Sequence, residues 1–157
     1  MKESIGTTWT FQLVIVFILI FVSFLIVTLT YSKTFKTKNE LINIIEKYEG
    51  VSQESLSIMN QYLRYNGYKV TKKCPAGWYG VTSIDKDSRL EYVGNNNIHK
   101  YYYCLKRESE EGSALAHYNI KVFFKFTLPV FETIGTFTVN GSTSDFYKTN
   151  DLLISKD

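Results

Sequence analysis

The amino-acid sequence predicts an α+β fold, in which a long N-terminal transmembrane helix continues as an amphipathic helix and packs on a small antiparallel β-sheet with one disulfide. Three observations predict this class. A continuous apolar segment lies near the N-terminus, an apolar stripe at helical spacing follows it, and much of the remainder alternates with the period of β-strands. We therefore divide the chain into a tail (1–10), a transmembrane helix (11–31), a helical extension (32–50) and an α+β extracytoplasmic domain (51–157).

The segment Phe11–Leu29 has the length and composition of a membrane-spanning helix. It has nineteen residues, and its polar members are Gln12, Ser23 and Thr28. At about 1.5 Å per residue it nearly crosses a hydrocarbon core of about 30 Å. Trp9 and Tyr31 bracket it, as expected for amphipathic rings that settle at the headgroup layers. A cleaved secretory signal is the alternative, but the residues after the segment lack a small-residue cleavage site.

Several side chains of the anchor are candidates for contacts with lipid or with other helices. Phe17, Phe21 and Phe24 fall on one helix face, and this stripe fits either helix–helix packing or simple lipid exposure. Phe11 joins these three, Trp9 and Tyr31 as an anchoring residue. Gln12 and Ser23 are candidates for interhelical packing, although for Ser23 and Thr28 we favour hydroxyls that bond back to their own helix.

The apolar pattern continues beyond the anchor without a Gly or Pro up to Glu49. Its residues recur at spacings of three and four, which is typical of one face of an amphipathic helix. The face that we expect to pack on the sheet comprises Leu41, Ile42, Ile45 and Tyr48, and its expected partners are Ile120, Val122, Phe124 and Phe126. Gly50 follows, where a left-handed C-terminal cap is expected.

A second helix and a set of strands are predicted after the extension. The helix covers Gln53–Tyr65, with Ser52 as its N-cap and Gly67 as its stop signal. The strongest strand patterns are those of His117–Leu128 and Tyr101–Lys106, and weaker ones cover Tyr68–Lys73 and Tyr79–Ile84. Residues 136–146, with a central Asn140-Gly141 pair, are typical of a terminal hairpin.

Cysteine usage and flanking charge bear on the orientation in the membrane. Cys74 and Cys104 are the only cysteines, which is what one structural disulfide in an oxidising compartment requires, although two buried thiols are the alternative. Lys33, Lys36 and Lys38 follow the anchor and by the positive-inside rule would place the C-terminal domain in the cytoplasm. We favour the cysteine argument, which predicts a single-pass cell-membrane protein with its C-terminal domain outside.

The sequence gives no motif for catalysis, a metal or a cofactor. His99 and His117 have no zinc-ligand spacing to the cysteines, and no nucleophile elbow or phosphate-binding loop is present. A net charge of +3, from 18 basic and 15 acidic residues spread along the chain, argues against a nucleic-acid partner. We expect no enzyme and no cofactor. The expected partners are the lipid bilayer and, through the transmembrane helix, other copies or other proteins in a homo- or hetero-oligomer. The sequence does not identify a ligand.

The order of these parts resembles the type IV pilin and pseudopilin superfamily, including the TadE-like minor pilins of bacteria. Trp9–Val16 is similar to the start of a pilin helix, and Gly6 stands where a processing glycine would be, although Gln12 takes the place of the family's early glutamate. The resemblance implies a structural subunit of a pilus-like or secretion-related surface assembly. The alternatives are an anchored monomeric module that binds or senses a ligand, and a viral envelope protein of the same layout.

Overall fold

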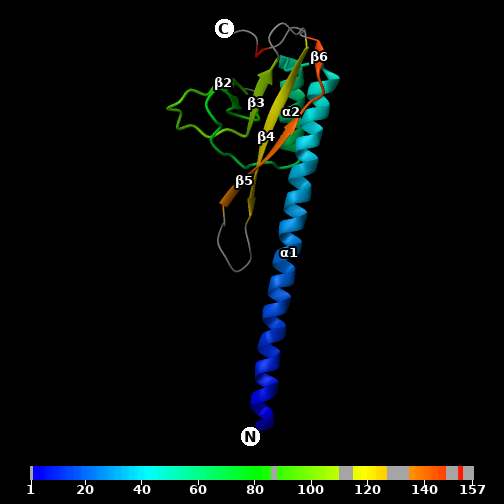
Figure 1. Cartoon of the computed structure of the whole chain (residues 1–157), viewed down its shortest axis with the longest axis vertical. Helices are drawn as coiled ribbons and strands as arrows, with labels where there is room; N and C mark the ends of the chain where they lie inside the picture. Colours follow the sequence, from blue (N-terminus) through cyan, green and yellow to red (C-terminus); the bar gives the residue numbers. More distant parts are fainter. Residues whose placement is uncertain (1, 86–87, 110–114, 127–134, 148–151, 154–157) are drawn as a thin grey trace.

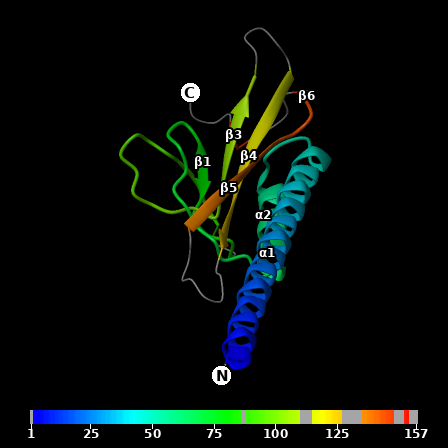
Figure 2. The same cartoon turned by 60° about the horizontal axis from the view of Figure 1, so that its bottom comes forward.

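The computed structural model describes residues 2–85, 88–109, 115–126, 135–147 and 152–153, with side chains from residue 9 onward. Within these residues the chain forms an α+β fold, as predicted. The helix α1 runs the length of the molecule, and its second half lies beside the sheet while its first half extends away from it (Figure 1). The view in Figure 2 shows the same separation of the two halves.

Helix α1 (Lys2–Lys47) is a single unbroken helix of 46 residues and therefore about 69 Å long. Its left-handed C-terminal cap lies one position earlier than predicted, at Glu49 instead of Gly50. Glu49, at φ 50°, takes the left-handed conformation, and the Gly50 amide then donates to the Ile45 carbonyl at 3.0 Å. This is the hydrogen-bond pattern of a Schellman cap, in which the residue after the left-handed one reaches back over the last turn.

Helix α2 (Gln53–Tyr65) has the predicted bounds. The Ser52 hydroxyl accepts from the Ser55 amide at 3.1 Å, and the Ser55 hydroxyl accepts from the Ser52 amide at 2.9 Å. This reciprocal capping box satisfies two amides at the start of the helix. Gly67, at φ 64°, then reverses the chain, which confirms the predicted stop signal.

The strands form one antiparallel sheet in the order β2-β1-β3-β4-β5, and β6 pairs with the first two residues of β4, Leu115 and Ala116. Their bounds are β1 Tyr79–Val81, β2 Leu90–Tyr92, β3 Tyr103–Glu108, β4 Leu115–Phe126, β5 Gly135–Ser142 and β6 Phe146–Tyr147. The two strongest predicted strands are confirmed as β4 and β3. The predicted strand at Tyr68–Lys73 is wrong, since only a single bridge between Lys72 and Tyr101 forms there, and β2 had no sequence prediction.

The predicted hairpin turn at Asn140-Gly141 is also wrong. Both residues lie inside β5 and pair with Lys121 and Ile120 of β4. The long β4 strand supplies backbone partners for all of β5, and this pairing favours an extended strand over a turn at Asn140-Gly141. A Cβ at position 141 would come within 2.6 Å of the Ile42 side chain, and the glycine therefore permits close contact between β5 and α1.

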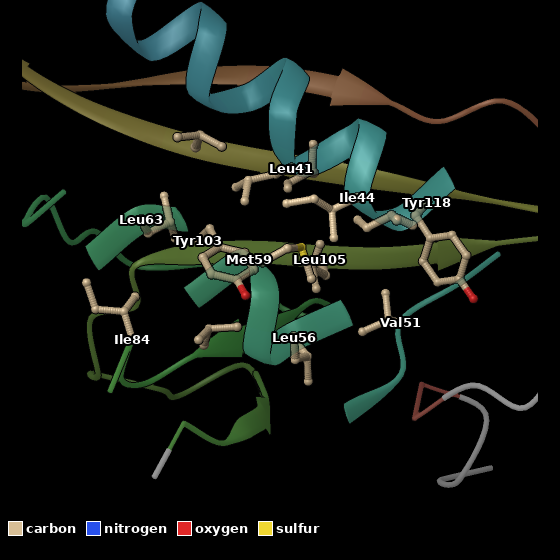
Figure 3. Close-up of a cluster of buried hydrophobic side chains, with 14 of the residues drawn as sticks. Leu41, Ile44, Val51, Leu56, Met59, Leu63, Ile84, Tyr103, Leu105 and Tyr118 are labelled. Carbon is tan, nitrogen blue, oxygen red and sulfur yellow. The ribbon is translucent and has the colours of Figure 1, made fainter. Parts of the chain in front are cut away.

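The main core lies between the sheet and the two helices (Figure 3). Leu41 and Ile45 of α1 are fully buried there beside Ile120 and Val122 of β4, which confirms the predicted packing of the stripe on the sheet. Ile42 and Tyr48 pack against the same cluster while partly exposed. The other residues of this cluster are Ile44, Val51, Leu56, Met59, Leu63, Val81, Ile84, Tyr103, Leu105, Tyr118 and Leu153.

A second, smaller cluster contains Cys74, Val93, Tyr101, Cys104 and Phe123. It explains why Phe123 interrupts the alternation of β4, because this strand is buried on both faces at that point. Phe124 is buried and contacts Tyr31, but it is not part of the main core cluster, and the side chain of Phe126 lies outside the described residues.

Candidate membrane anchor and membrane-proximal face

The first half of α1 is apolar and extends away from the folded domain (Figure 1). Among the described residues it is the one helix that is long and apolar enough to cross a membrane, with a mean hydropathy of 3.1 and no buried residue in its most apolar stretch. Trp9 and Tyr31 are separated by 22 positions and thus by about 33 Å along the axis, close to the thickness of a hydrocarbon core. Trp9 is 66% exposed and Tyr31 50% exposed.

The polar side chains inside this segment are satisfied mainly by the helix itself. The Ser23 hydroxyl donates to the Leu19 carbonyl at 2.7 Å, and the Thr28 hydroxyl donates to the Phe24 carbonyl at 2.9 Å. This confirms the favoured interpretation of both hydroxyls. Gln12 lies on the exposed surface of the helix.

The phenylalanine stripe of the anchor is exposed along its whole length. Phe17, Phe21 and Phe24 are 69, 55 and 65% exposed and lie on one face, and Phe11 is exposed to a similar extent. Large apolar side chains in such a continuous exposed band require lipid or other helices around them.

An aromatic cluster joins the helix to the sheet at the end of the apolar segment. The Tyr31 ring lies 6.2 Å from the Phe124 ring of β4 and 6.3 Å from the Phe35 ring, and Phe124 stacks on Phe137 of β5 at 5.4 Å. Because Phe124 of β4 contacts α1 at Tyr31, the sheet domain begins where the apolar segment ends, without an intervening linker (Figure 1). The sequence predicted Tyr31 but gave no sign of Phe35 or Phe137.

A pocket of about 270 Å³ opens beside this cluster, and we call it the lysine pocket. Among the described residues, three lysines from three different segments line it: Lys33 of α1, Lys69 of the segment after α2, and Lys125 of β4. None of the described residues that line it is acidic. The remaining lining residues are Thr30, Thr34, Thr37, Asn66, Gly67, Tyr68, Val70, Phe123 and Phe124.

Hydrogen bonds hold the walls of the lysine pocket in place. Thr34 and Thr37 are buried, and their hydroxyls donate to the carbonyls of Thr30 and Lys33 at 2.9 and 3.0 Å. The Tyr68 hydroxyl accepts from the Phe123 amide at 2.9 Å and lies 2.8 Å from the Phe123 carbonyl. The pairing of β3 with β4 ends at Val122, and the Tyr68 hydroxyl takes the place of a strand partner at the next residue, Phe123. Burial raises the pKa of Tyr68, so the hydroxyl stays protonated and can donate.

Comparison with known proteins gives no match to a family model, to a curated protein sequence or to a solved structure.

The two cysteines form the predicted disulfide, which joins the segment before β1 to β3. Cys104 is fully buried and Cys74 nearly so, within the second core cluster. The bond therefore lies on the face of the sheet opposite the two helices.

Several residues outside the anchor and the lysine pocket have structural roles. In the Tyr101–Tyr103 run, Tyr101 and Tyr103 are fully buried, and the Tyr103 hydroxyl donates to Asn60 of α2 at 3.1 Å. His117 lies 3.2 Å from Asp145 and 3.5 Å from Glu108. Lys106 hydrogen-bonds to Glu108 at 2.7 Å and lowers the pKa of that carboxyl.

Proposed function

We propose that this chain is a single-pass membrane protein that acts as a structural subunit of a pilus-like or secretion-related surface assembly. The proposal rests on the difference in burial between the two halves of α1. One half of an unbroken helix is exposed and apolar, and the other half is part of the core of a sheet domain. Movement or association of the apolar half is therefore transmitted to the domain as a rigid body.

The exposed half suits lateral association. In a bilayer, helices associate through packing of their side chains, and the surface around Phe17, Phe21 and Phe24 offers a continuous band for it. The aromatic cluster at Tyr31 fixes the sheet domain relative to the anchor. Copies that associate through their anchors would then present their domains in a repeated orientation, as a filament or export apparatus requires.

Replacing Phe21 by Arg is expected to abolish association between copies. Phe21 lies near the middle of the span, where an arginine costs about 2.5–3.5 kcal/mol on insertion scales and still allows insertion. A charged side chain on the packing face would reduce the crosslinked oligomer by about tenfold or more. The measurement is chemical crosslinking of the full chain in membranes, followed by sizing in detergent.

Leu19→Arg is the matched control for this experiment. It introduces the same charge at nearly the same depth, on the opposite face of the helix, because two residues correspond to about 200°. If both variants retain the wild-type oligomer, or if the wild type is monomeric, the assembly role is wrong. The monomeric binding or sensing module then becomes the better interpretation.

We also propose that the C-terminal domain lies outside the cell. The disulfide supports this orientation, because such bonds persist in oxidising compartments. Lys33, Lys36 and Lys38 argue for the opposite orientation by the positive-inside rule, but one of these lysines lines a pocket of the folded domain and thus has a second explanation.

Cysteine labelling in intact cells tests the orientation. The native cysteines are buried and bonded to each other, so a probe cysteine is introduced by Tyr65→Cys, at a side chain that is 91% exposed, and separately by Ser4→Cys before the anchor. We expect a membrane-impermeant maleimide to label position 65 in intact cells and position 4 only after permeabilisation. The reverse pattern would place the domain in the cytoplasm and contradict a surface assembly.

A further inference from the structure

We propose that the lysine pocket binds the phosphate group of an anionic phospholipid in the leaflet next to the sheet domain. The inference rests on the proposed function, because it requires residues 9–31 to span the bilayer. It extends that function, since it gives the domain a specific lipid ligand in addition to its anchor.

The first argument is the charge of the lysine pocket. Lys33, Lys69 and Lys125 come from three different segments, and the fold brings them to one concave site of about 270 Å³. Within the described residues, no carboxylate lies at ion-pair distance from these three side chains. Lys33 donates to the Asn66 carbonyl at 3.3 Å, a neutral partner that leaves its charge uncompensated. An uncompensated set of ammonium groups favours an oxyanion such as a phosphate.

The second argument is the depth of the lysine pocket. Its α1 wall extends from Thr30 to Thr37, about 10 Å along the helix axis, and therefore begins at the level of Tyr31. With Trp9 and Tyr31 at the edges of the hydrocarbon core, the part of this wall nearest Tyr31 lies in the adjoining headgroup layer, which is about 5–8 Å thick. Phospholipid phosphates lie in that layer.

The third argument is the make-up of the pocket's walls. Val70 and Phe124 supply apolar surface next to the lysines. Phe124 in turn contacts Tyr31, where the anchor leaves the apolar segment. A phosphate attached to glycerol and acyl chains can place its charge at the lysines and its glycerol against these side chains, whereas inorganic phosphate uses only the lysines.

The test measures lipid retention by the full chain with its disulfide intact. The protein is reconstituted in nanodiscs of phosphatidylcholine mixed with phosphatidylglycerol, transferred to detergent, and analysed by native mass spectrometry. We expect one phosphatidylglycerol to remain bound per chain, in preference to phosphatidylcholine. A lysine near an anionic surface contributes about fivefold to binding, so Lys33→Gln, Lys69→Gln and Lys125→Gln together should weaken retention by about 100-fold.

The matched control removes the same charge elsewhere. Lys36→Gln, Lys73→Gln and Lys100→Gln combine three exposed lysines that do not line the pocket, one of them a single turn from Lys33. Retention should stay within about twofold of the wild type. Equal loss in both triple variants would show an effect of total charge and overturn the proposal, as would equal retention of the two lipids by the wild type.

A second arm distinguishes a lipid from free phosphate and uses the full chain in detergent micelles. Inorganic phosphate and a short-chain phosphatidylglycerol are titrated, and binding is followed through the amide resonances of Gly67 and Lys69. Tighter binding of the lipid supports the proposal, whereas equal affinities would assign the site to free phosphate and overturn the lipid assignment. If the protein does not insert into the nanodiscs, the proposed membrane anchor is wrong. The phosphate titration in detergent then decides whether the lysine pocket is an anion site.

Discussion

Replacing Cys74 and Cys104 together by alanine is expected to lower the free energy of unfolding by about 3–4 kcal/mol. The disulfide closes a loop between residues that are 30 positions apart, and the chain-entropy model gives this magnitude for a loop of that size. Alanine suits the site because both positions are buried among apolar side chains and need no hydrogen-bond partner. At about 4 °C per kcal/mol for a domain of this size, the melting temperature should fall by about 12–16 °C.

The measurement is thermal unfolding of the full chain in detergent, followed by the fluorescence of Trp78, which packs against the disulfide cluster. A Trp9→Phe background removes the second indole from the signal. Reduction of the unsubstituted chain should reproduce the shift of the double variant. A melting temperature that neither change lowers would mean that the disulfide does not constrain the unfolded chain.

The fold was predictable wherever a periodic pattern coincides with burial on one face. The stripe around Leu41 and Ile45 and the alternation of Ile120 and Val122 each identify a buried face, and the two faces meet as predicted. The pattern fails at Asn140-Gly141, because a local turn preference competes with a long partner strand and with the space beside Ile42. It also fails for β2, whose three residues are too few for a period.

Of the candidate site, only the membrane anchor was predictable from the sequence. Trp9, Tyr31 and the phenylalanine stripe follow from composition and length alone. The lysine pocket does not, because 36 positions separate Lys33 from Lys69 and a further 56 separate Lys69 from Lys125. Only the packing of α1 on β4 and the reversal of the chain at Gly67 bring them together. Lys33 had a sequence interpretation as an orientation signal, whereas Lys69 and Lys125 had none.

Replacing Gly80 by alanine is expected to destabilise the folded domain by about 3 kcal/mol or more. Gly80 lies at the centre of β1, paired with both β2 and β3, and the ring of Tyr101 covers its α-carbon. An added methyl group would overlap that ring. Tyr101 is fully buried, and its hydroxyl is hydrogen-bonded to Asn97, so the ring cannot move aside without a shift of the backbone.

Gly94→Ala provides the control, because a Cβ at Gly94 meets no atom within 4 Å and the substitution should change stability by less than about 0.5 kcal/mol. The double variant Gly80→Ala/Tyr101→Leu then separates overlap from a general intolerance of β1. If overlap is the cause, the second substitution recovers part of the loss, and the two changes are strongly non-additive in thermal unfolding. Additive losses would instead mean that Gly80 is needed for its backbone freedom, and that the contact with Tyr101 does not fix the position of β1 against β3.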